Sequence, residues 1–224
     1  MNYLSKLLVG LVIILFLLGI FVFYKRMLIH NLSNIDLDYI YNYSRTGDLI
    51  LFRWHEISYY YDFVSSFTHV GMIFEHQNKK YILETHLKGD TDHMGYYDKG
   101  GVNIYELRNR INMYEGYNFY LKLNDNNRIF DLHKKIPIYK NISFNDKYKK
   151  HFLEYCLPKK ICETCFTPMY TESMFCSQLV GNILKDNNII DNDNIDLSCV
   201  TPHDFLNIEN KYGKIYDKLY KINK

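Results

Sequence analysis

The sequence lacks a strong charge imbalance, because 27 Lys and Arg residues face 25 Asp and Glu residues, for a net charge of +2. A nucleic-acid-binding chain is expected to carry a marked basic excess, so no nucleic-acid partner is predicted. An internal repeat and a regular strand–helix–strand alternation are also missing. Strands come first and helices are interspersed, a pattern that predicts an α+β fold with an antiparallel sheet packed against helices.

A second Cys-x-x-Cys pair is missing as well. The chain has five cysteines, so at least one is unpaired or engaged elsewhere. Cys162 and Cys165 form the one such pair, with Cys156 and His151 upstream. A structural zinc site needs four ligands. Zinc, a disulfide and free thiols remain open alternatives for this segment, and we predict no metal and no cofactor.

Charged residues are absent from residues 7–24, which read LLVGLVIILFLLGIFVFY. About 18 apolar residues are the minimum for a helix that crosses a bilayer. No small-residue cleavage site follows, so an uncleaved anchor is favoured over a signal peptide. We therefore predict a single-pass membrane protein with an anchor at 1–26, a linker at 27–45 and one domain at 46–224. The basic flanks are too evenly matched to orient the domain.

Two neighbouring strands are predicted at 68–75 and 80–86, and the polar link between them indicates a hairpin. The first contains His69 ahead of a strongly apolar run. In the second, strand alternation places Glu84 and His86 on one face. If the hairpin forms, one of these two side chains lies next to His69, and a carboxylate there would fix the tautomer and orientation of the imidazole.

A helix is predicted at 174–186 with Ser173 as its N-cap, which makes Cys176 the third helical residue. A thiol in the first turn feels the positive end of the helix dipole, and this lowers its pKa from about 8.5. By itself Cys176 is more typical of a structural cysteine on a buried apolar helix face than of a catalytic one. Together with His69 and Glu84, it completes a nucleophile, a base and an orienting acid.

Four segments in chain order carry a resemblance: TGDLILFR, THVGMIFE, YILETH and MFCSQLV. They resemble the circularly permuted papain-like thiol hydrolases of the NlpC-type superfamily, in the branch of YiiX-like bacterial proteins, lecithin:retinol acyltransferase relatives and a poxvirus protein. The later segment CVTPHDFL resembles the stretch that follows the nucleophile helix in this branch. The resemblance implies Cys176 as nucleophile, His69 as general base and Glu84 as orienting acid, with Gly47 and Asp48 forming a structural turn.

The implied activity is attack of a thiolate on an amide, ester or thioester carbonyl, as in a membrane-anchored cysteine hydrolase or acyltransferase. The expected substrate is lipid-like, acylated or peptidic. Two alternatives remain open. One is a papain-like peptidase, and the other is a non-catalytic binding or virion-structural module that keeps the fold.

Overall fold

One seven-stranded sheet organises the domain, in the strand order β1-β13-β8-β2-β3-β4-β7. Its strands are β1 Asn34–Asp36, β2 Leu49–Arg53, β3 His69–His76, β4 Lys79–His86, β7 Gly101–Glu106, β8 Tyr117–Leu123 and β13 Tyr216–Asn223. The computed structural model describes residues 3–54, 67–86, 91–92, 95–96, 100–129, 131–140, 143–144, 173–190, 197 and 200–224.

Five α-helices lie within the described residues: α1 Tyr3–His30, α2 Leu37–Tyr43, α4 Leu107–Met113, α5 Leu132–Lys140 and α8 Cys176–Asp186. A short 3-10 helix, η2, spans Asp204–Leu206. Three two-stranded pairs complete the secondary structure: β5 Thr91–Asp92 with β6 Gly95–Tyr96, β9 Ser143–Phe144 with β10 Ser173–Met174, and β11 Glu209–Asn210 with β12 Gly213–Lys214. The α+β class is therefore confirmed.

The main sheet is mixed rather than purely antiparallel, which corrects the prediction. β1 pairs parallel with β13, while the other neighbouring strands of the sheet pair antiparallel. The parallel pair joins Asn34 to Lys221, so it links the segment that follows α1 to the last strand of the sheet in the sequence. β1 and α2 occupy the region predicted as a linker at 27–45. A three-residue strand is too short for its alternation to predict such a remote pairing.

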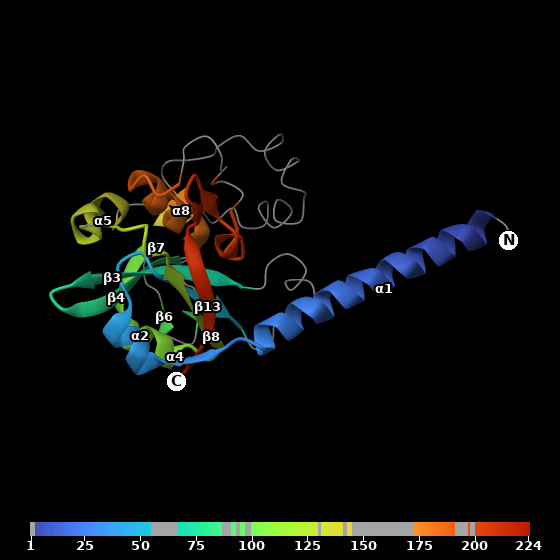
Figure 1. Cartoon of the computed structure of the whole chain (residues 1–224), viewed down its shortest axis with the longest axis horizontal. Coiled ribbons are helices and arrows are strands. Elements are labelled where there is room, and N and C mark those ends of the chain that lie inside the picture. The colour runs from blue at the N-terminus through green and yellow to red at the C-terminus, as the bar shows by residue number, and fades with distance from the viewer. Residues whose placement is uncertain are drawn as a thin grey trace.

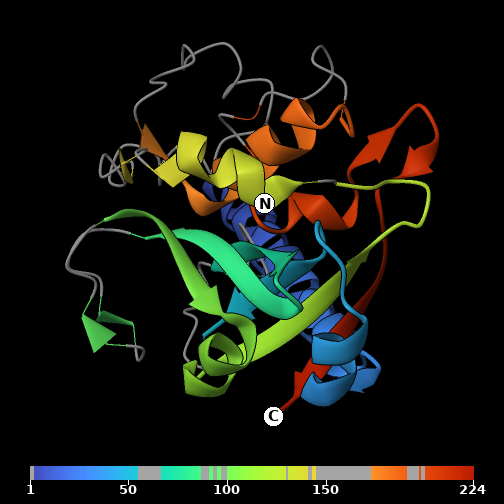
Figure 2. The same cartoon turned by 90° about the vertical axis from the view of Figure 1, so that its left-hand side faces the viewer.

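Helices cover both faces of the sheet (Figures 1 and 2). α5 and α8 lie on one face, and α2 and α4 lie on the other. Strand alternation supplies the two buried clusters between them. Val70, Met72 and Phe74 join the larger cluster under α8, whereas Ile73 joins the smaller cluster with residues of α2 and α4. The site described below lies where the strands between these two layers end.

The predicted hairpin is confirmed by β3 and β4, which pair antiparallel from Met72 opposite Leu83 to His76 opposite Lys79. Its turn residues, Gln77 and Asn78, have φ angles of 50° and 60°. Positive φ at both central residues is the signature of a type I′ turn, which matches the twist of the flanking strands. This tight connection fixes the register of the two strands that carry the candidate site residues.

The turn before β2 places Asp48 inside the fold. Gly47 has a φ of 103°, and a Cβ added there would lie 2.7 Å from Leu123 Cδ2. The Asp48 carboxylate accepts hydrogen bonds from the Tyr120 hydroxyl at 2.6 Å and from the Leu123 N–H at 2.8 Å. Asp48 thus ties the start of β2 to β8.

Helix α1 extends away from the sheet (Figure 1). Its large apolar side chains from Leu7 to Ile20 are exposed. Within the part of the chain that the structure describes, no helix combines the length and apolarity that crossing a membrane requires. The predicted transmembrane anchor, membrane partner and single-pass localisation are corrected accordingly, because the structure does not support them.

Candidate functional site

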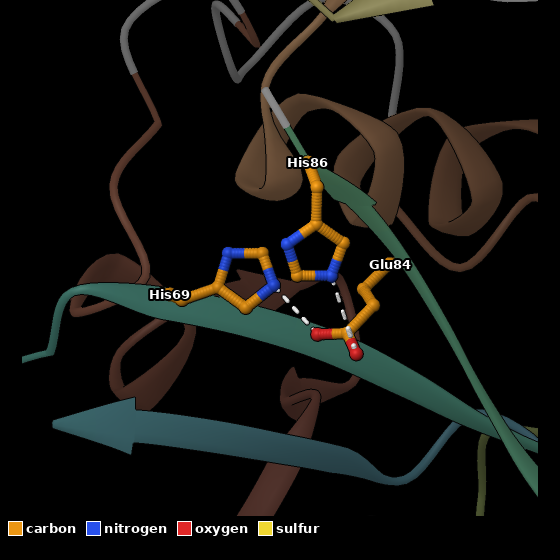
Figure 3. A group of neighbouring side chains, drawn as sticks. All are labelled: His69, Glu84 and His86. Carbon is orange, nitrogen blue, oxygen red and sulfur yellow. Dashed lines mark hydrogen bonds and ion pairs between the residues drawn. The ribbon is translucent and has the colours of Figure 1, made fainter. Parts of the chain in front are cut away.

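Two strand ends bring three polar side chains together (Figure 3). β3 begins at His69 and β4 ends at His86, and the strands run antiparallel. Continuing the hairpin register puts His69 opposite His86 and Gly71 opposite Glu84. Glu84 and His86 share one face of β4, as alternation requires. The hairpin thus gathers the residues that the sequence analysis selected on these strands.

The closest contact in this group joins His69 and Glu84. The His69 Nε2 atom lies 2.6 Å from Glu84 Oε2 (Figure 3). The Glu84 side chain is completely buried, whereas that of His69 keeps 18% of its surface exposed. A carboxylate bound to Nε2 leaves Nδ1 as the nitrogen through which the imidazole exchanges a proton with another group. Both alternatives of the sequence analysis are realised, since Glu84 contacts His69 directly and His86 lies beside it.

Gly71 makes room on the same face of the hairpin. A Cβ at this position would lie 2.7 Å from the Ile82 side chain and 3.3 Å from the Glu84 Cβ. The space that the missing side chain leaves is therefore filled by Ile82, with Glu84 alongside. A larger residue at position 71 therefore clashes with the Ile82 side chain and presses on the Glu84 Cβ.

Cys176 reaches His69 from the opposite layer. It is a half-buried free thiol and the first residue of α8. Its sulfur lies close enough to the His69 ring for each group to shift the pKa of the other, and the backbone N–H groups of Val70 and Ser177 also act on the sulfur. Because Glu84 holds Nε2, we assign the thiol contact to Nδ1. The three residues therefore form a continuous Cys–His–Glu chain of contacts.

The start of α8 corrects one prediction. The helix begins at Cys176 with Phe175 as N-cap, so Cys176 is the first rather than the third helical residue. Ser173, predicted as the cap, belongs to β10 and pairs with β9. The Gln178 side chain accepts a hydrogen bond from the Phe175 N–H at 3.0 Å, which satisfies this helix start without a Ser or Thr cap. The thiol nonetheless lies in the first turn, where the helix dipole favours an anion.

The electrostatics favour an ion pair between Cys176 and His69. Burial alone would lower the pKa of His69, but the adjacent Cys176 thiolate and Glu84 carboxylate outweigh it and raise this pKa to about 10. Burial likewise raises the pKa of the Cys176 thiol, and the His69 imidazolium with the two backbone N–H donors outweighs it, so the pKa is lowered. A thiolate next to an imidazolium is the nucleophilic form of such a pair.

Sequence reasoning missed Arg110 of α4. Its side chain is 1% exposed and forms an ion pair with Glu84 through Nε and Oε1, with a second contact of 3.3 Å from Nη2 to Oε2. Burial favours the neutral form of Glu84, but Arg110 and the two histidines hold its pKa well below the usual range. A buried carboxylate needs a countercharge. Nothing in the sequence distinguishes Arg110 from the other basic residues as that partner.

His86 completes the surroundings of Glu84. Its Nε2 lies 3.4 Å from Glu84 Oε1, and its ring centroid lies 4.9 Å from that of His69 (Figure 3). Burial lowers the pKa of His86, and the neighbouring charges of His69 and Arg110 lower it further. The Glu84 carboxylate opposes this shift but does not reverse it. His86 is therefore neutral where His69 is charged.

His69, Glu84 and His86 form a candidate metal-binding group, because their donor atoms lie within 4.8 Å of one another. The contacts of Glu84 with Arg110 argue against a metal ion at this position. Both Glu84 oxygens already bind Arg110, and a cation placed among these donors would lie against the guanidinium. Like charges in a buried site repel strongly. The donor set therefore fits a hydrogen-bonded triad better than a metal centre.

Other predicted features lie outside the described residues. They include Cys156, Cys162, Cys165 and His151, which the sequence analysis weighed as a zinc site.

Comparison with models of known protein families gives no match for this chain, and comparison with curated protein sequences gives none either.

Proposed function

We propose that the chain is a cysteine hydrolase or acyltransferase of the permuted papain-like type, with Cys176, His69 and Glu84 as its triad. The observation that carries this proposal is the contact chain from the Cys176 sulfur through the His69 ring to the Glu84 carboxylate. The chain order, with the histidine and the acid before the cysteine, is that of the permuted family that the sequence resembles.

The proposed reaction begins with the Cys176 thiolate and the His69 imidazolium. The sulfur attacks the carbonyl carbon of an amide, ester or thioester, and the carbonyl electron pair moves to oxygen. Backbone N–H groups at the start of α8 stabilise this oxyanion, with the Cys176 N–H as the first donor. The intermediate collapses when His69 gives its proton to the leaving amine, alcohol or thiol, and an acyl thioester remains on Cys176.

The second half of the reaction frees the enzyme. Water or another acceptor approaches the thioester, and His69, now neutral, takes a proton from it as general base. The bond between carbon and sulfur breaks, and the Cys176 thiolate leaves next to a recharged imidazolium. Glu84 keeps Nε2 protonated throughout, so Nδ1 is the atom that gives and takes the proton.

The test is the reactivity of the thiol in the full chain. Wild type, Cys176→Ala and His69→Ala are treated with iodoacetamide at about pH 6, and each cysteine peptide is quantified by mass spectrometry. We expect Cys176 to react at least roughly tenfold faster than N-acetylcysteine and than Cys199, because its thiolate is populated below the usual pKa of about 8.5. His69→Ala is expected to remove this advantage.

A second arm tests acyl transfer itself. The same variants are incubated with 4-nitrophenyl acetate, and an acetyl adduct on Cys176 is expected in wild type and absent in Cys176→Ala. Labelling of Cys176 at the rate of N-acetylcysteine, unchanged in His69→Ala, contradicts the proposed function. It supports instead a non-catalytic module that keeps the fold.

A further inference from the structure

The acid of the proposed triad has a dedicated cation behind it. Arg110 and Glu84 are 1% and 0% exposed, and the guanidinium contacts both carboxylate oxygens. A carboxylate held by a planar guanidinium at two points has a fixed plane as well as a fixed position. This leaves Oε2 aimed at His69 Nε2, which is the contact that orients the imidazole.

Aromatic rings hold the guanidinium in turn. The Arg110 guanidinium carbon lies 4.5 Å from the centre of the Phe52 ring and 5.4 Å from that of Tyr114. Phe52 also contacts the His69 ring, with 5.4 Å between the ring centroids. One aromatic side chain therefore packs against both the cation behind the acid and the base in front of it. Arginine suits such a stacked site better than lysine.

The charges of the buried group sum to zero. The Cys176 thiolate and the Glu84 carboxylate are negative, and the His69 imidazolium and Arg110 guanidinium are positive, while His86 is neutral. Buried charges persist only when they are paired and hydrogen-bonded. Without Arg110, the same pocket would hold one uncompensated anion, and proton uptake by Glu84 would relieve it.

We propose that Arg110 is a positioning residue of this site, whose guanidinium fixes the orientation and the charge of Glu84 so that Glu84 in turn fixes His69. The inference rests on the proposed function, because it concerns the same triad. Arg110 contacts neither the reacting sulfur nor a substrate in this assignment, and it acts through Glu84.

Arg108 supplies a matched control on the same helix. It forms an ion pair of 2.5 Å with Asp38, and both side chains are exposed to solvent. Arg108→Gln removes one arginine and one ion pair from α4 without touching the triad. A general loss of α4 stability affects both variants, whereas a positioning role affects only changes at Arg110.

The experiment measures the rate of Cys176 alkylation by iodoacetamide against pH in the full chain. The variants are Arg110→Gln, Arg110→Lys, Arg108→Gln, Glu84→Gln and the double variant of Glu84→Gln with Arg110→Gln. In Arg110→Gln we expect the acid limb of the rate–pH profile, where the rate rises with pH, to move to higher pH by about one unit. The reaction on that limb then becomes roughly tenfold slower. Arg110→Lys keeps the charge but not the two-point contact and moves the limb by less, and Arg108→Gln leaves it in place.

The double variant separates positioning from general damage. If Arg110 acts through Glu84, its removal produces no further upward shift once Glu84 is already Gln. A wild-type acid limb in Arg110→Gln, or an equal upward shift in the Glu84→Gln background, overturns the proposal. Should Arg110→Gln not fold, Arg110→Lys decides, and an acid limb at the wild-type position overturns it.

The result for wild type separates the two proposals. Fast Cys176 alkylation that depends on His69 but not on Arg110 removes only the positioning role. Alkylation no faster than that of N-acetylcysteine removes the proposed function itself.

Discussion

Asp48 and Glu84 are both completely buried carboxylates of the same sheet region, and their surroundings differ in kind. Asp48 is held mainly by neutral donors, namely the Tyr120 hydroxyl and the backbone N–H groups of Arg45 and Leu123. Glu84 is held by the Arg110 guanidinium and two imidazoles. One carboxylate connects two strands of the sheet through neutral donors, and the other lies within a cluster of charged and titratable groups.

The pKa values of the two carboxyls move in opposite directions. Burial raises the pKa of Asp48 above its usual value, although its hydrogen bonds oppose the shift. Burial acts in the same sense on Glu84, but the Arg110 charge and the neighbouring histidines outweigh it and lower the pKa well below the usual range. Burial alone therefore says little about the role of a carboxylate, and the charge of its partners decides it.

Glu84→Gln should produce the largest effect and separate the two sites most clearly. We expect Cys176 alkylation at about pH 6 to slow by roughly 100-fold, because a neutral amide neither stabilises the His69 imidazolium nor fixes its tautomer. The change also leaves Arg110 buried without its countercharge, which costs about 3–5 kcal/mol. Urea unfolding, followed alongside the alkylation rate, separates the two effects.

The control for this prediction is Arg110→Gln added to Glu84→Gln. It is expected to recover part of the lost stability, because it removes the uncompensated charge, while the alkylation stays slow. A Glu84→Gln protein that alkylates at the wild-type rate contradicts the role assigned to the acid.

Asp48→Ala should affect stability and spare the chemistry. It leaves the Tyr120 hydroxyl and the Leu123 N–H buried without their acceptor, and each such group costs about 1–3 kcal/mol. We expect the free energy of unfolding to fall by about 2–4 kcal/mol in urea titrations. In the fraction that remains folded, the alkylation rate of Cys176 stays within about twofold of wild type. A large loss of thiol reactivity in folded Asp48→Ala would erase the contrast between the two carboxylates.

The glycine beside each carboxylate offers a smaller test of the same contrast. Gly47→Ala forces a side chain onto a φ of 103° and against Leu123, and is expected to cost about 1–2 kcal/mol of stability. Gly71→Ala presses on Ile82 and on the Glu84 Cβ, so it should slow alkylation severalfold. Adding Ile82→Ala to Gly71→Ala removes both carbons that clash, Cγ1 and Cδ1, and should restore part of the rate. If instead Gly47→Ala slows alkylation and Gly71→Ala does not, the two glycines have been assigned to the wrong roles.

Lowering the pH should change the stability contributions of Glu84 and Asp48 in opposite directions. We expect this effect to be the smallest. The lowered pKa of Glu84 adds stability above its unfolded pKa, which is lost as pH falls toward the folded value. The raised pKa of Asp48 does the reverse, so its contribution declines as pH rises from about 3.9 to the raised value. A tenfold change in either acid dissociation constant on folding corresponds to about 1.4 kcal/mol of stability.

Urea unfolding of wild type and Asp48→Asn between about pH 3 and pH 6 measures the Asp48 contribution. We expect the stability of wild type relative to the variant to decrease across this interval. An increase with pH would mean that the Asp48 carboxylate prefers its charged form in the folded protein.

Local sequence patterns were sufficient to predict the hairpin and the candidate site residues that it carries. Alternation along 80–86 placed Glu84 and His86 on one face, and the structure pairs that strand with the one carrying His69. The thiol was selected by its place at the start of an amphipathic segment, and the mutual pKa shifts of Cys176 and His69 show that the two groups are adjacent. These predictions depend on residue periods of two and of about four, which a sequence displays directly.

Contacts between distant segments were not predictable in this way. Arg110 follows β7 on α4, and its pairing with Glu84 depends on how that helix packs under the sheet. The parallel pairing of β1 with β13 likewise joins segments that lie far apart in the sequence. The membrane anchor was predicted from an uncharged run alone, and no helix within the described residues supports it.

The titration of the Cys176 thiol tests the central claim most directly. Thiolate absorbance is measured against pH for wild type, Cys176→Ser, His69→Ala and the variant with both changes. The difference between each protein and its partner lacking Cys176 isolates this thiol. We expect the thiolate absorbance of Cys176 to rise with a pKa well below the value of about 8.5 for an ordinary cysteine. In His69→Ala we expect this pKa to increase. A Cys176 pKa at or above about 8.5 in wild type, or a lowered pKa that His69→Ala does not change, would contradict a Cys176 thiolate stabilised by His69.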